Sequence, residues 1–212
     1  GRLVISERIG MLKKYELRDR HFGWERPPRP ASEKEINEYF LERALRSQAV
    51  VSLDSICHLK PSIKPGLRKI IDQRVKLGEL IPITLRGYEK VPHWIRAVDF
   101  RESIRLRDSL VQILSPFDPL TIQRKRLKCL FDYEHLFEAY LPKEKRKLGY
   151  FALPVLIGDQ IVAALDLKTD REAGKLRMQK WTWMRGFKSM ELKREIETEL
   201  GRFERFQLNR IS

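Results

Sequence analysis

The sequence contains few cysteines and no long hydrophobic run. Its two cysteines, Cys57 and Cys129, lie far apart in the chain, so a disulfide framework is excluded and a reduced, cytosolic chain is expected. The longest uncharged stretch, from Leu148 to Gly158, is too short to cross a membrane. The sequence also lacks a glycine-rich phosphate loop and the histidine and serine motifs of common hydrolases. We therefore expect no membrane span, no metal site and no cofactor.

Acidic residues are outnumbered: 43 lysines and arginines stand against 29 aspartates and glutamates, which gives a net charge of +14. Such an excess predicts an anionic partner, with nucleic acid first and an acidic membrane surface or an acidic protein second. Hydrophobic residues make up 42% of the 212 positions, which is enough to bury a core and to exclude wholesale disorder. The length allows one large domain or two small ones.

Two stretches of the sequence share one pattern. Each begins with Gly-x-Leu, continues as an apolar strand, reaches a polar tip near a second glycine and then returns; the first spans 1–15 and the second spans 78–90. Apolar runs between glycines are typical of β-hairpins, because glycine permits tight turns. The sequence thus predicts tandem copies of one small unit.

The residues before the second hairpin predict what this unit is. Ser32 and Glu35 form a Ser-x-x-Glu capping box that opens a helix ending near Ser47. Two further helices are expected over 53–59 and 64–77, the second of them rich in lysine and arginine. Three helices followed by a two-stranded wing is the order of a winged helix-turn-helix, in which the third helix is the candidate for the major groove.

The second half of the sequence changes from helical to strand-like periodicity. A helix is expected near 99–110 and a basic helix over 121–130, and Gly158-Asp159 predicts a two-residue hairpin turn. Four strands in succession predict an antiparallel sheet or a small barrel, followed by a charged C-terminal helix over 189–208. The predicted strands span 133–141, 149–157, 160–168 and 175–183.

The expected fold class is α+β: a winged helix-turn-helix, then an antiparallel β-barrel-like domain, then a C-terminal helix. The first segment is interpreted as the wing of a truncated preceding winged helix plus a stiff linker rich in proline and arginine, so that the sequence begins inside a domain. The predicted boundaries are 1–30 for the wing and linker, 31–98 for the winged helix, 99–187 for the barrel-like domain and 188–212 for the helix.

Three carboxylates and two tryptophans could serve a site, and each has a structural alternative. Asp118 is either a carboxylate at the mouth of a site or the cap of the following helix, and we favour the cap. Asp166 and Asp170 are expected to pair with a neighbouring lysine or arginine. Trp181 and Trp183 share one face of the last strand, where they either pack in the core or stack on a base, and we favour the core.

A series of motifs gives the sequence a resemblance to a known family. They occur in this order: Leu114-Ser-Pro-Phe-Asp-Pro-Leu120, Gln123-Arg124-x-Arg126, Leu130-Phe131-Asp-Tyr133, Tyr140-Leu-Pro-x-x-Lys145-Arg-x-x-Gly-Tyr150, Leu153-Pro, Gly158-Asp159 and Asp166-x-Lys168-x-Asp170-Arg171. Together they resemble the C-terminal half of the winged-helix DNA glycosylases, the AlkZ/YcaQ-like family that unhooks interstrand crosslinks. The resemblance covers residues 1–184 and is strongest over 113–171. The combination is specific, although each motif is short.

The resemblance implies tandem winged helices followed by a β-barrel-like domain, which together form a concave surface for DNA. The implied activity is that of a monofunctional glycosylase, which hydrolyses the N-glycosidic bond of alkylated or crosslinked purines without a metal or organic cofactor. The family's catalytic motif, a Gln-apolar-Gln or Gln-apolar-Asp triplet in the N-terminal winged helix, has no counterpart in this sequence. No catalytic residue is therefore carried over, and the chain by itself is expected to be inactive.

The resemblance implies that this chain contacts double-stranded DNA that carries damage. We expect the protein to be a monomer and to be cytoplasmic and associated with the nucleoid. The first candidates lie over 142–148, which is expected to be the tip of a long hairpin; the basic helix and the third helix come second and third. Cations of this kind contact phosphates and fix register without reading the base sequence. The candidate residues are Lys143, Lys145, Arg146 and Lys147 at the tip, Arg124 and Arg126 on the basic helix, and Lys64, Arg68 and Lys69 on the third helix.

Two other classes of protein fit parts of this pattern. A transcription regulator would read an operator with its winged helix, but it needs base-reading side chains such as Asn or Gln on the recognition helix. The third helix offers mainly long cations, which favours contact with the DNA backbone. A protein-protein scaffold would carry its charge for solubility alone, and it would show little or no salt-sensitive DNA binding.

Overall fold

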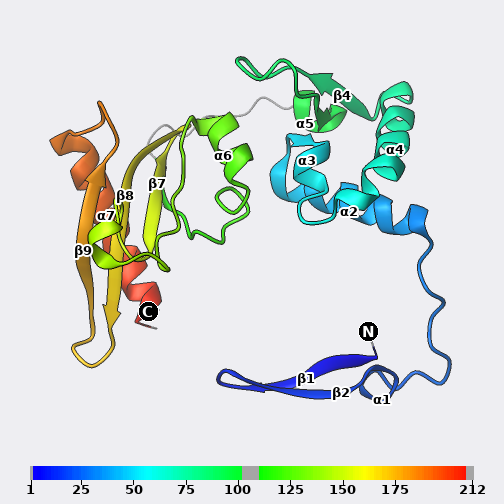
Figure 1. The fold of residues 1–212 in the computed structure, drawn as a ribbon, viewed down its shortest axis with the longest axis horizontal. Coiled ribbons are helices and arrows are strands. Elements are labelled where there is room, and N and C mark those ends of the chain that lie inside the picture. Colours follow the sequence, from blue (N-terminus) through cyan, green and yellow to red (C-terminus); the bar gives the residue numbers. More distant parts are fainter. Residues whose placement is uncertain (1, 102–109, 209–212) are drawn as a thin grey trace. The chain divides into compact units, whose positions relative to one another are not determined.

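The computed structural model describes residues 2–101 and 110–208 (Figure 1). The chain forms two compact units, Gly1–Ile36 and Asn37–Ser212. In the first unit, strands β1 (Leu3–Ile9) and β2 (Leu12–Leu17) pair as an antiparallel hairpin, followed by the short helix α1 (Arg18–His21). The hairpin expected from the first Gly-x-Leu stretch is therefore confirmed. No side chain over 2–36 is buried.

Helix α2 (Glu33–Gln48) confirms the helix expected from the capping box. The side chain of Glu35 accepts a hydrogen bond from the backbone nitrogen of Ser32 at 2.8 Å, and the Ser32 hydroxyl accepts one from the nitrogen of Glu35 at 3.3 Å. Two orphan backbone donors at the helix start are thus satisfied reciprocally. The elements that follow are β3 (Val51–Ser52), α3 (Leu53–Ile56), the 3-10 turn η1 (Pro61–Ile63) and α4 (Lys64–Lys76).

Helix α4 leads into strands β4 (Leu80–Ile83) and β5 (His93–Arg96), and β5 lies between β3 and β4 in a three-stranded antiparallel sheet. The helices and this sheet enclose one core, in which Leu41, Leu67 and Ile71 are fully buried. Helix α5 (Ala97–Arg101) follows β5. The remainder of the helix predicted near 99–110 lies outside the described residues.

A second, four-stranded antiparallel sheet lies in the C-terminal half, in the order β6-β7-β8-β9. Strands β7 and β8 are joined by the Gly158-Asp159 turn that the sequence predicts, and Ile157 pairs with Gln160 across it. Among the described residues none of the sheets closes on itself, so the predicted barrel is wrong and the four-stranded sheet is open. The strands are β6 (Val111–Ile113), β7 (Ala152–Ile157), β8 (Gln160–Asp170) and β9 (Lys175–Trp183).

This open sheet is covered on both faces. Helix α7 (Met190–Gln207) buries Ile196 completely among Val155 and Leu165 of one face. Helix α6 (Arg124–Phe131) buries Leu127 among Leu156 and Ile161 of the other. Alternate residues of a strand point to opposite faces, so β7 and β8 each contribute side chains to two separate cores. None of the helices in the described ranges combines the length and the apolar character that a membrane crossing requires.

The strand predicted over 133–141 does not form. This stretch belongs to no strand and ends in a turn, and β6 occupies the edge of the sheet beside β7 instead. Tyr133 and His135 are nevertheless buried while the residues between and beside them are exposed. The alternating pattern in the sequence therefore predicted which side chains are buried. It did not show that the stretch pairs with another strand.

Candidate nucleic-acid interface

Three lysines and one arginine gather in the basic segment, by which we mean residues 142–148. Its first half is the 3-10 turn η2 (Lys143–Lys145). The side chains of Lys143, Lys145 and Lys147 are exposed, whereas Arg146 is half-buried. Because the stretch before it is not a strand, the segment is a loop that leads into β7 rather than the hairpin tip that the sequence predicts.

The end of this loop is held by the carboxylate of Glu138, a residue that is only 2% exposed. The carboxylate accepts hydrogen bonds from the backbone nitrogens of Lys147, Leu148 and Gly149 at 2.8, 2.6 and 3.1 Å. Burial disfavours the charged form, but the three donors and the nearby charge of Lys180 outweigh it, so the pKa of Glu138 lies below its usual value. A buried negative charge thus fixes the end of the basic segment, including the backbone of Lys147.

Asp166 continues this arrangement from inside β8. Its carboxylate accepts hydrogen bonds from the backbone nitrogens of Tyr150 and Phe151 at 2.7 and 3.2 Å. Gly149, at a φ of +139°, lies so close that a Cβ there would come within 2.3 Å of the carboxylate oxygen Oδ2 of Asp166. Only glycine fits this position. Asp166 was expected to pair with a neighbouring cation, and backbone amides are its hydrogen-bond partners instead.

Arg146 joins the two ends of the loop. Its Nε donates a hydrogen bond to the carbonyl oxygen of Leu141 at 2.8 Å, and its guanidinium lies over the ring of Tyr150 at 4.8 Å from the centroid. Lys180 on β9 donates a further hydrogen bond to the carbonyl oxygen of Lys147 at 2.7 Å. Arg146 is therefore engaged within the loop, while the exposed lysines are available to a partner.

Aromatic rings lie directly beside the basic segment in a group that we call the aromatic cluster: Phe117, Phe137, Tyr140 and Phe151. The ring of Phe137 lies 5.6 Å from that of Phe117, 5.8 Å from that of Tyr140 and 5.6 Å from that of Phe151, centroid to centroid. Tyr140 is 89% exposed and Phe117 is 61% exposed. The cluster thus presents two rings to solvent on a base of two half-buried rings.

A tight turn holds Phe117 in place. Its backbone nitrogen donates to the hydroxyl of Ser115 at 3.2 Å, and the backbone nitrogen of Asp118 donates to the carbonyl oxygen of Ser115 at 2.9 Å. The hydroxyl of Thr121, a residue with no exposed surface, donates to the same carbonyl oxygen. Pro116 is buried and Pro119 fixes the next φ angle, so the turn has little conformational freedom.

The carboxylates of Asp118 and Asp170 also have structural partners. Asp118 accepts a hydrogen bond from the backbone nitrogen of Leu120 at 2.8 Å. It therefore caps the turn, and the prediction that it caps the next helix is wrong because α6 begins only at Arg124. Asp170 accepts from the backbone nitrogen of Ala173 at 3.0 Å and pairs with Arg177 at 2.7 Å.

The two candidate arginines of α6 have different environments. Arg124 is exposed, whereas Arg126 donates from one terminal nitrogen to the carbonyl oxygens of Gln48 and Val50 at 2.9 and 3.4 Å. Burial lowers the pKa of Arg126 from its usual value. Beside it, Gln123 donates to the carbonyl oxygen of Ser55 at 3.1 Å. Arg126 and Gln123 thus tie α6 to the segment 48–55 of the same unit, and of the two candidate arginines Arg124 is the exposed one.

The candidates on α4 are partly engaged by neighbours. Lys64 forms an ion pair with Asp54, which raises the pKa of the lysine. The guanidinium of Arg68 lies over the ring of Trp94 at 5.6 Å from the centroid and 4.0 Å from a carboxylate oxygen of Asp72. Lys69 is exposed one residue further along the helix. This helix therefore presents a weaker cationic face than its sequence suggests.

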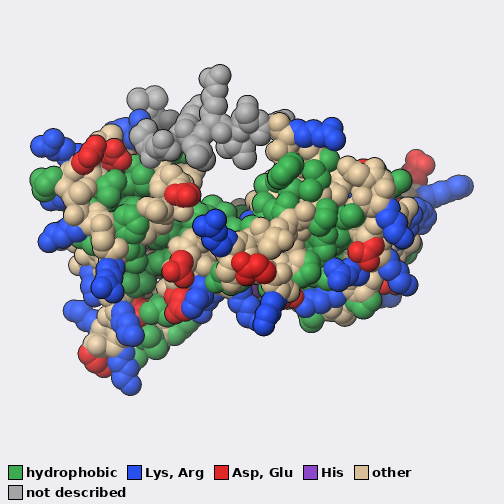
Figure 2. Space-filling model, turned by 90° about the horizontal axis from the view of Figure 1, so that it is seen from above, with side chains coloured by type: hydrophobic (Ala, Val, Ile, Leu, Met, Phe, Trp, Pro, Cys, Tyr) green, Lys and Arg blue, Asp and Glu red, His purple; other side chains and the backbone are tan. Residues whose placement is uncertain are grey.

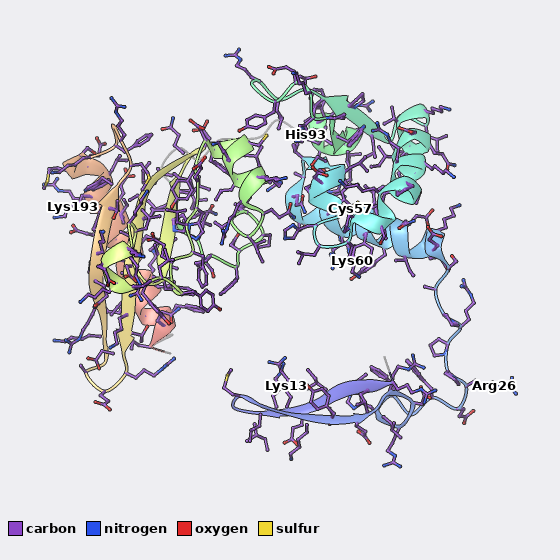
Figure 3. All side chains as sticks on the ribbon, viewed as in Figure 1. Lys13, Arg26, Cys57, Lys60, His93 and Lys193 are labelled. Carbon is purple, nitrogen blue, oxygen red and sulfur yellow. The ribbon has the colours of Figure 1, made fainter. Side chains whose placement is uncertain are left out.

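Trp181 and Trp183 pack against the core between the sheet and α7, with their ring centroids 5.2 Å apart. Both are half-buried and line a cavity of about 570 Å³ together with residues at the start of α7. Lys193, labelled in Figure 3, is one of these lining residues and pairs with Glu197 at 3.6 Å. The core-packing interpretation of the two tryptophans is confirmed.

Cys57 and His93, also labelled in Figure 3, are buried residues of the helical part. Burial raises the pKa of the Cys57 thiol and lowers the pKa of His93, whose Nδ1 lies 2.8 Å from the carbonyl oxygen of Val91. Within the described ranges, no group of three or more His, Cys, Asp or Glu side chains is arranged to hold a metal ion. These two residues have surroundings typical of structural positions.

Figure 2 shows lysine and arginine side chains spread over the visible face and interspersed with acidic ones. What distinguishes the basic segment is therefore its rigid backbone and its aromatic neighbours rather than local charge alone. The supporting residues Glu138 and Gly149 were not predicted from the sequence. A signal for one such support exists, because Asp166 interrupts an otherwise apolar buried strand and an acidic residue there requires hydrogen-bond donors.

An α+β chain that holds exposed lysines on a fixed loop beside exposed aromatic rings has the features of a nucleic-acid-binding protein. A protein-family model described as "DNA glycosylase AlkZ-like" matches residues 1–206. The chain therefore belongs to the AlkZ-like DNA glycosylase family, as its sequence motifs suggested. No solved structure matches the chain.

Proposed function

We propose that this chain binds damaged double-stranded DNA, as the DNA-contacting part of a glycosylase that hydrolyses the N-glycosidic bond of alkylated or crosslinked purines. Membership of the AlkZ-like family supports the repair role. The observation that carries the DNA contact is the basic segment, in which Lys143, Lys145 and Lys147 are exposed and the backbone of Lys147 is held by the buried carboxylate of Glu138. Side chains that are already positioned bind phosphates with a smaller entropic cost than flexible ones.

The arrangement of α2, α3, α4 and the β3-β5-β4 sheet supports a winged helix, with β4 and β5 as its wing. In this proposal α4 lies against the DNA backbone, with Lys69 and Arg68 contacting phosphates, and Arg124 of α6 adds a further contact. A helix that offers mainly long cations suits a repair protein, which must act on many sequences. We expect the protein to act as a monomer in the cytoplasm, on nucleoid DNA.

The buried carboxylates are not proposed as catalytic groups. Glycosidic hydrolysis needs a carboxylate or amide that faces the attacking water or the developing positive charge. The oxygens of Glu138 and Asp166 accept backbone hydrogen bonds from five consecutive residues, 147–151, and both side chains are buried. Their role is to shape the loop.

Fluorescence anisotropy with two duplexes of the same sequence, one intact and one with a central abasic site, tests the proposal. We expect binding to both and a preference for the abasic duplex, which resembles the product of base removal. Lys143→Glu with Lys145→Glu should weaken both affinities at unchanged melting temperature, whereas the exposed pair Arg171→Glu and Lys175→Glu is the matched control. Equal effects of the two double variants would contradict a specific role for the basic segment.

A further inference from the structure

Packing does not explain why two rings of the aromatic cluster, those of Phe117 and Tyr140, are exposed. A tyrosine with 89% of its surface exposed and a phenylalanine with 61% exposed gain little from packing, since most of their apolar area still faces water. Phe117 is also held by a turn with three hydrogen bonds to Ser115 and two flanking prolines. An exposed ring held in a fixed position by a rigid turn is suited to stacking against another flat group.

The exposed lysines beside the cluster indicate that the flat group belongs to a ligand with negative charge. Tyr140 precedes the basic segment by two residues, and Lys143 and Lys145 are exposed in it. Phe151 of the cluster and Gly149 of the adjoining loop are held by Asp166 and Glu138, so the backbone between the basic segment and Phe151 is fixed. Flat apolar rings beside exposed ammonium groups are the combination that binds unpaired nucleotides, in which bases stack and phosphates pair with cations.

We propose that the aromatic cluster stacks against an unpaired base of DNA through Phe117 and Tyr140, while Lys143 and Lys145 hold the adjoining phosphates. This inference rests on the proposed DNA-binding function and adds to it a preference for DNA in which the stack of bases is interrupted. Stacking on an aromatic side chain contributes whichever base is present, so no sequence preference is expected. In an intact duplex each base is already stacked on its neighbours, and the cluster gains no such contact.

The tryptophan pair of β9 is another aromatic group beside a lysine, and it serves as the internal comparison. Trp181 and Trp183 are half-buried and pack against the core under α7, so less of their ring surface is exposed than that of Phe117 and Tyr140. Phe206 of α7 is the matched control for Phe117, because it is 63% exposed, close to the 61% of Phe117, and lies outside the cluster.

The test measures affinities for an intact duplex and for the same duplex with a three-nucleotide single-stranded gap of thymidines. The wild-type chain should prefer the gapped duplex by about tenfold, which is within the range measured for stacking of one or two bases. Phe117→Ala and Tyr140→Ala should each reduce that preference about fivefold or more and leave the affinity for the intact duplex unchanged. Phe206→Ala should alter neither value, and Tyr140→Phe should retain the preference because it keeps the ring.

The outcomes separate this inference from the proposed function. Salt-dependent binding to both duplexes without any preference for the gap overturns the stacking inference and leaves the DNA-binding function in place. A preference that survives both alanine variants, at unchanged melting temperature, also overturns it. Absence of binding to either duplex overturns both proposals. Lys143→Gln with Lys145→Gln should weaken binding to both duplexes and keep the preference, since these residues contact phosphates.

Discussion

Glu138 and Asp166 hold the same loop from adjacent positions, although 28 residues separate them in the sequence. Glu138 accepts hydrogen bonds from the backbone of residues 147–149, and Asp166 accepts them from residues 150–151, so five consecutive backbone N–H groups end on two buried carboxylates. Backbone donors on a loop normally face water. Here they face inward, which fixes the end of the basic segment and the residues that lead into β7.

Replacing Glu138 with Gln should lower the free energy of unfolding by about 2 kcal/mol at pH 7, because a charged acceptor of several hydrogen bonds becomes neutral. Since the pKa of Glu138 is lowered in the folded chain, its contribution is complete above its unfolded pKa of about 4.3 and is lost as the pH falls through the folded pKa. Urea unfolding at pH 7 and below pH 4 measures this.

The difference between wild type and Glu138→Gln should therefore shrink as the pH falls. Glu144→Gln, an exposed substitution in the same loop, is the control and should have almost no effect. A difference that stayed constant down to low pH would show that the charge of Glu138 contributes nothing to the loop.

Gly149→Ala should destabilise the chain by about 3 kcal/mol, because it combines a backbone conformation that favours glycine with a steric clash against Asp166. Gly78→Ala is the matched comparison: Gly78 also has a positive φ, +72°, but its Cβ would meet no atom within 4 Å. Only backbone strain acts there, and it should cost about 1 kcal/mol. Thermal unfolding of both variants measures the difference, and equal losses would contradict the close approach of Asp166.

Arg124→Ala and Arg126→Ala should affect different properties, DNA affinity in the first case and stability in the second. Arg126 bonds the carbonyl oxygens of Gln48 and Val50, so its loss should lower the free energy of unfolding by about 2 kcal/mol. Arg124 is exposed, and its loss should leave stability unchanged and weaken duplex binding. Melting curves and anisotropy on both variants separate the roles, and a stable Arg126→Ala variant with weakened DNA binding would reverse the assignment.

Removing residues 1–28 should leave the melting temperature of the remaining chain within about 2 °C of the original, because no side chain over 2–36 is buried. The truncation keeps Arg29 and Ser32, which hydrogen-bond Glu35 at the start of α2. Differential scanning calorimetry measures the transition. A fall of many degrees would mean that the hairpin stabilises the rest of the chain.

Local signals in the sequence predicted local structure well. The Ser32–Glu35 capping box and the Gly158-Asp159 turn each depend on a few adjacent residues, and each formed where it was expected. Among the described residues the larger errors concern long-range pairing, and the expected helix cap at Asp118 was a local error. The stretch over 133–141 alternates as a strand does, but the partner of β7 proved to be β6, a three-residue strand whose sequence carries little periodicity.

The candidate site divides in the same way. The lysines of the basic segment are visible in the sequence because charge is a property of each residue. The residues that support them are not visible, because the hydrogen bonds of Glu138 to residues 147–149 form only when the chain folds back and brings the two segments together. The engagement of Arg126 and Arg68 by neighbours depends equally on tertiary contacts.

The salt dependence of duplex affinity tests the central claim most directly. Removing one cation that neutralises a phosphate should make the slope of log affinity against log salt less steep by about 0.9. Lys143→Gln with Lys145→Gln should therefore reduce the slope by about 1.8, while the control pair Arg171→Gln and Lys175→Gln should leave it as in the wild type. An unchanged slope in the first double variant, or no salt dependence in the wild type, would contradict DNA binding through the basic segment.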